Sequence, residues 1–333
     1  MTESIKKVIR KITNQEDNYT IFGDDTAKQW LISSKIKKYI RISQNIWSIW
    51  IEFEKEHYFA ITDVDIPLKF FKESFKFLER QELNAGIWVS IISELELELK
   101  KDYDELNLTE VIEYIWKVEH KRSKIVFNEV VSSKSLEDFF PKIYLFKVLE
   151  TLSEDQIYQI TGQILSKSTS NHLLPYNNKI LDKFYEIFEK GHKNIPFDNI
   201  LASYTASDYR FAYLDLYRCL EKLQILFFFQ KLHQEAKIQD SLIDFCRKFY
   251  NETKLEPKLS DSLKKLFRSV FDEKIAEKRA DSFYKIRNGI VHLGVVNKVE
   301  IPNQTDKEKW NTHILDLIEI IMLVYDKNGG LLD

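Results

Sequence analysis

The fold of this chain is decided by one stretch of its second half, residues 205–227, which reads TASDYRFAYLDLYRCLEKLQILF. Apolar residues recur in it at spacings of three and four positions: Tyr213, Leu216, Leu220, Leu223 and Phe227. This period predicts an amphipathic α-helix with one buried face. Thr205 and Asp208 form a capping-box pattern directly before it, so we expect the helix to begin there.

Three more amphipathic helices are expected after this one. One follows Ser241, and the last begins at Thr305 with Glu308, again a capping-box pattern. Between them, an apolar pattern that follows Pro257 and runs to Ile275 predicts a single long helix. Four such helices with short connections are typical of an up-and-down four-helix bundle, which we place at about residues 201–330.

The composition agrees with a mainly α protein. Among 333 residues there are only 8 Gly and 6 Pro, while 44% are hydrophobic and 30% are charged. The formal net charge of −3 leaves no global basic excess, so contact with nucleic acid would require a local patch. Two cysteines, Cys219 and Cys246, are too few for a disulfide framework or a zinc site, and we expect both to be small buried hydrophobic residues.

The first 65 residues predict a small β-containing region. Apolar and polar residues alternate in the segment 47–53, and the segment 57–62 is similarly strand-like, so a hairpin that turns at residues 54–56 is expected. Shorter strand candidates are Tyr19–Phe22 and Tyr39–Ile42. From about residue 66 to residue 200 the apolar period becomes helical, and we interpret this region as a helical sensor or regulatory module.

One cluster near the end of the third predicted helix can carry chemistry. It is Arg287-Asn288-x-x-x-His292, in a chain that has no phosphate-binding glycine loop and no zinc-protease motif. Positions five apart on a straight helix lie about 140° apart, so Arg287 and His292 would not share a face. Asn288-Gly289 is a helix-break signal that could re-aim them. The plainer interpretation is a cation at a helix C-terminus, a C-cap at Gly289 and a loop histidine.

The motif, late in a predicted four-helix bundle, resembles the HEPN superfamily. Ribonuclease members of that superfamily carry Arg, four to six residues and then His, usually with a polar residue after the Arg. The resemblance implies that Arg287, His292 and Asn288 are catalytic, and that an acidic residue of the first helix, Glu221, is auxiliary. It covers about residues 201–330 and does not extend to the first 200 residues.

The chemistry suits these residue types. A histidine can act as acid or base near neutral pH, and an arginine offers a fixed fork of donors to phosphate oxygens. We therefore expect a metal-independent endoribonuclease that needs no cofactor and leaves a 2′,3′-cyclic phosphate and a 5′-hydroxyl. The resemblance further implies a homodimer, with two motifs in one cleft, and a toxin or anti-phage defence effector with an unknown trigger or neutralising partner. Phe283 and Tyr284 cannot both face one core, so one of them is available to a partner chain.

Two alternatives stay open. One is a non-catalytic HEPN-like module for dimerisation or nucleotide binding, and the other is a helical interaction protein in which the motif is accidental. The segment 254–287 carries ten Lys or Arg against six Asp or Glu, which fits an RNA-facing stripe or an ordinary salt-bridged helix face. No apolar run reaches the length of a signal peptide or a membrane span, so a cytoplasmic protein without membrane contact is expected.

Overall fold

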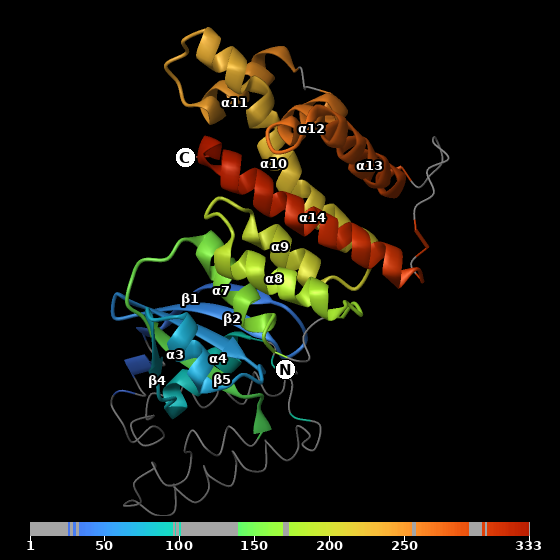
Figure 1. The fold of residues 1–333 in the computed structure, drawn as a ribbon. Coiled ribbons are helices and arrows are strands. Elements are labelled where there is room, and N and C mark those ends of the chain that lie inside the picture. The colour runs from blue at the N-terminus through green and yellow to red at the C-terminus, as the bar shows by residue number, and fades with distance from the viewer. Residues whose placement is uncertain are drawn as a thin grey trace, which may run out of the picture. The chain divides into compact units, whose positions relative to one another are not determined.

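The computed structural model describes residues 26, 29–30, 33–95, 97, 100, 139–168, 173–254, 258–292, 302–303 and 305–332. The chain divides into two compact units, which we call unit 1 (Met1–Thr151) and unit 2 (Leu152–Asp333) (Figure 1). The described residues are mainly helical and include one antiparallel sheet, which lies in unit 1, so the predicted fold class is confirmed at this level.

Unit 1 is built on a sheet of five strands in the order β1-β2-β3-β5-β4. The strands are β1 (Lys35–Arg41), β2 (Trp47–Phe53), β3 (Glu56–Thr62), β4 (Leu78–Gln81) and β5 (Ile143–Val148). The hairpin of β2 and β3 confirms the prediction, and it turns through Glu54 and Lys55, which both have positive φ. Two successive residues of positive φ form the tight turn whose twist matches that of the flanking strands. The candidate Tyr39–Ile42 overlaps β1, whereas Tyr19–Phe22 lies outside the described residues.

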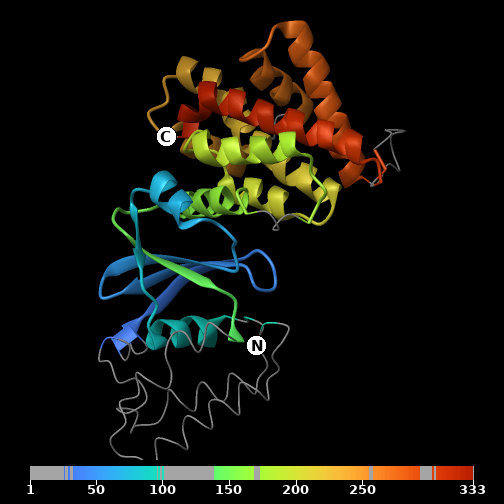
Figure 2. The ribbon, with the colours of Figure 1, turned by 60° about the horizontal axis from the view of Figure 1, so that its bottom comes forward.

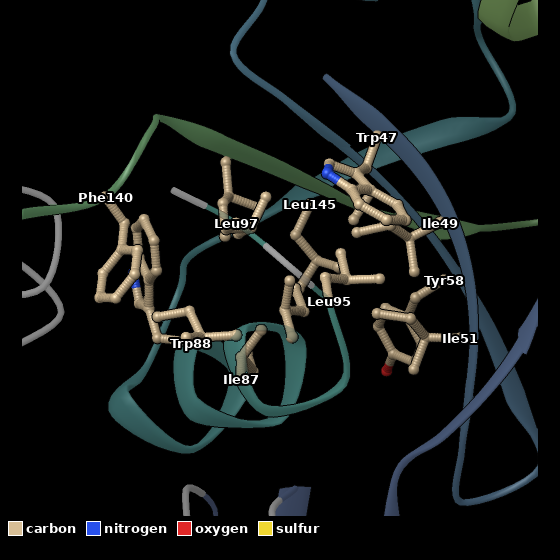
Figure 3. Packing of buried hydrophobic residues seen from close by; sticks show 14 of the residues in the cluster. Trp47, Ile49, Ile51, Tyr58, Ile87, Trp88, Leu95, Leu97, Phe140 and Leu145 are labelled. Atoms are coloured by element: carbon tan, nitrogen blue, oxygen red, sulfur yellow. The ribbon is translucent and has the colours of Figure 1, made fainter. Parts of the chain in front are cut away.

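Helices cover the two faces of this sheet, as Figure 2 shows. They are α3 (Leu68–Ser74) and α4 (Ala85–Glu94). On one face α4 packs against alternate residues of β2 in an apolar cluster shown in Figure 3. On the other face, the ring of Phe71 in α3 lies 5.3 Å from the ring of Tyr144 and 4.7 Å from that of Phe146, both in β5. Burial on both faces explains why β5 reads as a nearly continuous apolar run.

Two strands of the sheet lie in the region 66–200, which the sequence predicts to be helical. β5 pairs with β3 in antiparallel fashion, from His57 opposite Val148 to Thr62 opposite Ile143, and β4 pairs with β5. The helical expectation is therefore wrong for residues 78–81 and 143–148. The β3 partners of β5 are more than 80 positions away in the sequence and its β4 partners more than 60, so no local period reveals the pairing. Unit 1 consequently extends to Thr151, beyond the β-containing region that we expected at 1–65.

Unit 2 is helical throughout its described residues. Its helices are α7 (Glu154–Leu165), α8 (Asn178–Lys190), α9 (Phe197–Thr205), α10 (Tyr209–Glu235), α11 (Leu242–Thr253), α12 (Leu259–Arg268), α13 (Glu273–Val291) and α14 (Lys307–Asn328), followed by the 3₁₀ helix η3 (Gly329–Leu332). The long helix α10 packs against α9, α11, α12 and α14. The Tyr325 hydroxyl of α14 donates a hydrogen bond to the Cys219 carbonyl of α10 at 2.8 Å, and this buried bond links the two helices.

The structure corrects three helix boundaries in unit 2. The third predicted helix is two helices, because α12 ends at Arg268 and α13 begins after Asp272, whose carboxylate accepts the Ile275 N–H at 3.0 Å. Thr305 does not cap α14, which is capped by Asp306. Thr205 is the last residue of α9, and Asp208 alone caps α10. The region 201–330 thus begins inside α9 and holds the five helices α10–α14, so the four-helix HEPN-like arrangement stays a prediction.

Candidate functional site

The candidate site lies at the C-terminal end of α13 and on the adjoining face of α10. α13 continues through Asn288 and Gly289 to Val291, and His292 is its C-cap, with its backbone N–H donating to the Asn288 carbonyl at 2.9 Å. The predicted helix break at Asn288-Gly289 is therefore wrong. Gly289 keeps helical hydrogen bonding and is buried, so it serves close packing here and does not stop the helix.

Arg287 and Glu221 form an ion pair between α13 and α10. The Glu221 Oε1 atom accepts from Arg287 Nε at 3.2 Å and from Nη2 at 3.0 Å. Their side chains are 21% and 28% exposed, so the pair is partly shielded from water and lies within reach of a ligand. The structure thus brings together two of the predicted site residues that are 66 positions apart in the sequence.

Asn288 adds a second contact to the guanidinium. Its Oδ1 atom accepts from Arg287 Nη1 at 3.1 Å. A guanidinium has five N–H donors, and three of them are used by Glu221 and Asn288. One N–H on Nη1 and one on Nη2 have no partner among the described residues. These two N–H groups can donate hydrogen bonds to the oxygens of a phosphate without breaking the ion pair.

His292 is exposed at the end of α13. No hydrogen bond or ion pair joins its imidazole to any described residue. Because α13 is continuous, Arg287 and His292 lie about 140° apart around the helix and about 7.5 Å apart along its axis. Asn288 and His292 are four positions apart and share a face. The structure therefore joins Arg287 with Asn288 and Glu221, and no hydrogen bond or ion pair among the described residues joins the imidazole to them.

Tyr217 is a site residue that the sequence reasoning missed. Its side chain is buried, and its hydroxyl has no hydrogen-bond partner among the described residues. Burial raises the pKa of this hydroxyl, the nearby Glu221 carboxylate raises it further, and Arg287 lowers it. A polar group without a partner is costly inside a protein. The signal available in the sequence was the spacing of four between Tyr217 and Glu221 within a strongly apolar helix face.

Of the two neighbouring aromatic residues beside the motif, only one is fully buried, as the sequence suggested. Phe283 is buried in unit 2, Tyr284 is half-buried, and Val291 is 45% exposed. The last turn of α13 thus presents apolar surface next to Arg287 and His292, which leaves room for a partner chain.

The described part of the chain also bears on metal binding, membrane insertion and the chemistry of the two cysteines. No group of three or more His, Cys, Asp or Glu side chains there is placed to hold a metal ion. None of the helices described is long and apolar enough to cross a membrane. Cys219 is buried as expected, whereas Cys246 is only half-buried, and burial raises its pKa to about 11. A thiol with so high a pKa is a poor nucleophile at neutral pH.

Comparisons of the chain with family models, with curated proteins and with solved structures find no match. The candidate site is therefore judged on its own geometry. That geometry offers a half-buried guanidinium, with two donors that have no partner among the described residues, and an exposed imidazole at the end of the same helix. These groups suit the binding of a phosphodiester and the transfer of a proton near it.

Proposed function

We propose that this chain is a metal-independent endoribonuclease of the HEPN type. Arg287, His292 and Asn288 are its catalytic residues, and Glu221 is the auxiliary acid. The observation that carries the proposal is the guanidinium of Arg287, which Glu221 and Asn288 hold in place while one donor each on Nη1 and Nη2 has no partner in the part of the chain that the structure describes. A pre-oriented donor pair is what the developing charge on a phosphate requires.

The reaction follows from these groups. A base removes the proton of the ribose 2′-hydroxyl, and the 2′-oxygen forms a bond to phosphorus. The bond between phosphorus and the 5′-oxygen breaks, and the leaving oxygen takes a proton from an acid. The products are a 2′,3′-cyclic phosphate and a 5′-hydroxyl, and no water is consumed. The imidazole of His292 handles a proton, and the free donors of Arg287 bind the non-bridging oxygens.

We propose further that the active form is a homodimer built through the C-terminal helices. Within one chain Arg287 and His292 lie about 140° apart around α13, so a second copy that brings its own motif alongside supplies the missing proton-transfer group. An isologous interface repeats each contact and so provides two of every residue. The exposed Val291 and half-buried Tyr284 beside the motif provide apolar surface for such an interface. The first 200 residues act as a sensor or regulatory region, and the protein is a cytoplasmic toxin or defence effector.

The experiment is an RNA cleavage assay of the purified chain with total RNA in EDTA. We expect cleavage to persist, with cyclic phosphate and 5′-hydroxyl ends found by sequencing. His292→Ala should lower the rate by about 10²–10⁴-fold, the usual contribution of general acid–base catalysis. His233→Ala, about 18 Å along α10 from Glu221, is the matched control and should retain activity. Mixing wild type with excess inactive chains should lower specific activity as heterodimers form.

Three results would count against the proposal. They are strict dependence on Mg²⁺ or Mn²⁺, equal cleavage by wild type and the His292 variant, and cleavage by a protein that light scattering shows to be monomeric. The last result would remove only the dimeric part of the proposal. Expression in a host tests the toxin role separately, because wild type should slow growth and His292→Ala should relieve the effect.

A second candidate function is a non-catalytic HEPN-like module. The observation in its favour is that Glu221 already pairs with Arg287, so the guanidinium also links α10 to α13. In that case Arg287→Ala would loosen unit 2, and neither wild type nor variant would cleave RNA.

A further inference from the structure

Acidic side chains of α13 lie at its contact with α12. They pair with cations of α12. Arg268 contacts Glu273 at 3.1 Å and Glu277 at 2.5 Å, and Lys264 contacts Asp281 at 2.8 Å. Two cations of α12 thus pair with three carboxylates of α13.

Three lysines of α13 lie next to these acids around the helix. Lys274, Lys278 and Lys285 are exposed, and none of the three forms an ion pair with a described residue. Their spacings of four and seven place them within about 40° of one another around the helix, and a further seven positions lead to His292 on the same line. We call these three residues the lysine stripe. Asp281 lies beside the stripe, three positions after Lys278 and four before Lys285, and pairs with Lys264. In Figure 1, α13 lies at the outer side of unit 2, beside α12.

We propose that the lysine stripe is a binding track for the phosphate backbone of single-stranded RNA, and that it leads the strand to His292. This inference rests on the proposed function and deepens it, because it assigns the residues that hold the substrate beyond the scissile bond. From the rise of the helix, Lys285, Lys278 and Lys274 lie about 10, 21 and 27 Å from His292 along the axis. A substrate must therefore extend over several nucleotides to reach all three.

The residue types in the lysine stripe indicate which part of an RNA it recognises. A lysine ammonium is a point charge on a flexible stem, and it binds phosphate without demanding a fixed geometry. The stripe itself contains no aromatic side chain on which a base can stack. Contacts to phosphates position a nucleic acid but carry no sequence information. Recognition by the stripe is thus independent of sequence and strongly dependent on salt.

The test compares the triple variant Lys274→Gln, Lys278→Gln, Lys285→Gln with wild type. The probe is a fluorescent RNA oligonucleotide with 2′-fluoro riboses, which cannot form a cyclic phosphate, and anisotropy is measured over a range of NaCl concentrations. Loss of three phosphate contacts should reduce the slope of log Kd against log salt by about 2, and it should weaken binding about 100-fold at 0.1 M salt. The control Lys179→Gln, Lys190→Gln, Lys231→Gln carries the same charge change elsewhere in unit 2 and should bind as wild type does.

Cleavage assays separate this inference from the proposed function. A dinucleotide is too short to reach the stripe, so the triple variant should cleave it at the wild-type rate while kcat/KM for a long RNA falls. Unchanged binding and cleavage of long RNA by the triple variant would overturn the inference and leave the nuclease proposal intact. Loss of binding in a chain that never cleaves RNA would support the track and overturn the nuclease. Equal affinity of wild type for polyglutamate and RNA would overturn the assignment to RNA.

Discussion

Two contacts in this molecule are built on opposite principles. In unit 1, Ile49 and Ile51 of β2 pack against Ile87 and Ile91 of α4, and all four side chains are at least 97% buried (Figure 3 shows this core). In unit 2, the contact between α10 and α13 includes the ion pair of Glu221 and Arg287. The first contact is apolar, and the second depends on charges that are partly removed from water.

The difference shows where this chain retains groups that do not favour stability. Apolar packing is non-directional and stabilises in proportion to the area that it buries. Removing the two charges of a partly buried ion pair from water costs free energy, which their attraction has to offset. A protein with apolar residues in place of the pair would often be as stable. The α10–α13 contact is therefore a better place to look for function than the core of unit 1. Three predictions test whether the two contacts differ in this way.

The largest effect on stability is expected in the core of unit 1. Ile91→Ala removes a fully buried side chain from α4 without reducing helix propensity, and it should lower the free energy of unfolding of unit 1 by about 2–5 kcal/mol. Urea denaturation followed by tryptophan fluorescence measures the change. Leu68→Ala on α3, where the leucine is 43% exposed, is the control and should change stability by less than about 0.5 kcal/mol. A loss below 1 kcal/mol for Ile91→Ala would mean that the core relaxes around the cavity.

At the polar contact we expect activity to fall and stability to change little. Arg287→Lys keeps the positive charge but loses the planar fork that binds Glu221, Asn288 and phosphate together. The value of kcat/KM for RNA should fall about 100-fold, while the free energy of unfolding changes by less than about 1 kcal/mol. Arg279→Lys is the matched control on α13, where the guanidinium lies over the ring of Phe271. A lysine variant with near wild-type activity would reduce Arg287 to a structural or electrostatic role.

What the sequence predicted well was set by neighbours along the chain. The hairpin of β2 and β3 follows from alternation on either side of a two-residue turn, and the α10 helix follows from its apolar period. Ser153 accepts the Gln156 N–H and completes a capping box at the start of α7, which is also a local pattern. The meeting of Glu221 and Arg287 was expected only from the resemblance, since a contact across 66 positions has no local signal.

What the sequence did not predict depends on partners far away or on competing local signals. The strand β5 is apolar on both faces and pairs with β3 across most of unit 1, so its short apolar run has no diagnostic period. The break between α12 and α13 was missed because the apolar period continues through Val270 and Phe271, although Asp272 marks a new helix start. At Gly289, helical hydrogen bonding and burial outweigh the tendency of glycine to end a helix.

The smallest expected change in the free energy of unfolding comes from removing the hydroxyl of Tyr217. Whether the variant is more or less stable than wild type tests whether that hydroxyl has a partner. This hydroxyl is buried without a partner among the described residues, whereas the hydroxyl of Tyr213, one turn earlier on α10, donates to the Phe283 carbonyl at 3.2 Å. The two rings stack at a centroid distance of 6.4 Å, so each phenylalanine variant keeps its packing. We expect Tyr217→Phe to raise the free energy of unfolding of unit 2 by about 1 kcal/mol and Tyr213→Phe to lower it by a similar amount.

The pH dependence of unfolding sharpens this last comparison. Burial raises the pKa of Tyr217 above the value near 10 of an unfolded tyrosine. The folded state therefore keeps the proton where the unfolded state loses it, and this contribution to stability declines as pH rises above about 10. The advantage of Tyr217→Phe should thus grow from pH 8 to pH 10.5 in urea titrations of the two proteins. If Tyr217→Phe is the less stable protein at pH 8, the hydroxyl has a partner in solution, and the α10–α13 contact is better satisfied than its geometry indicates.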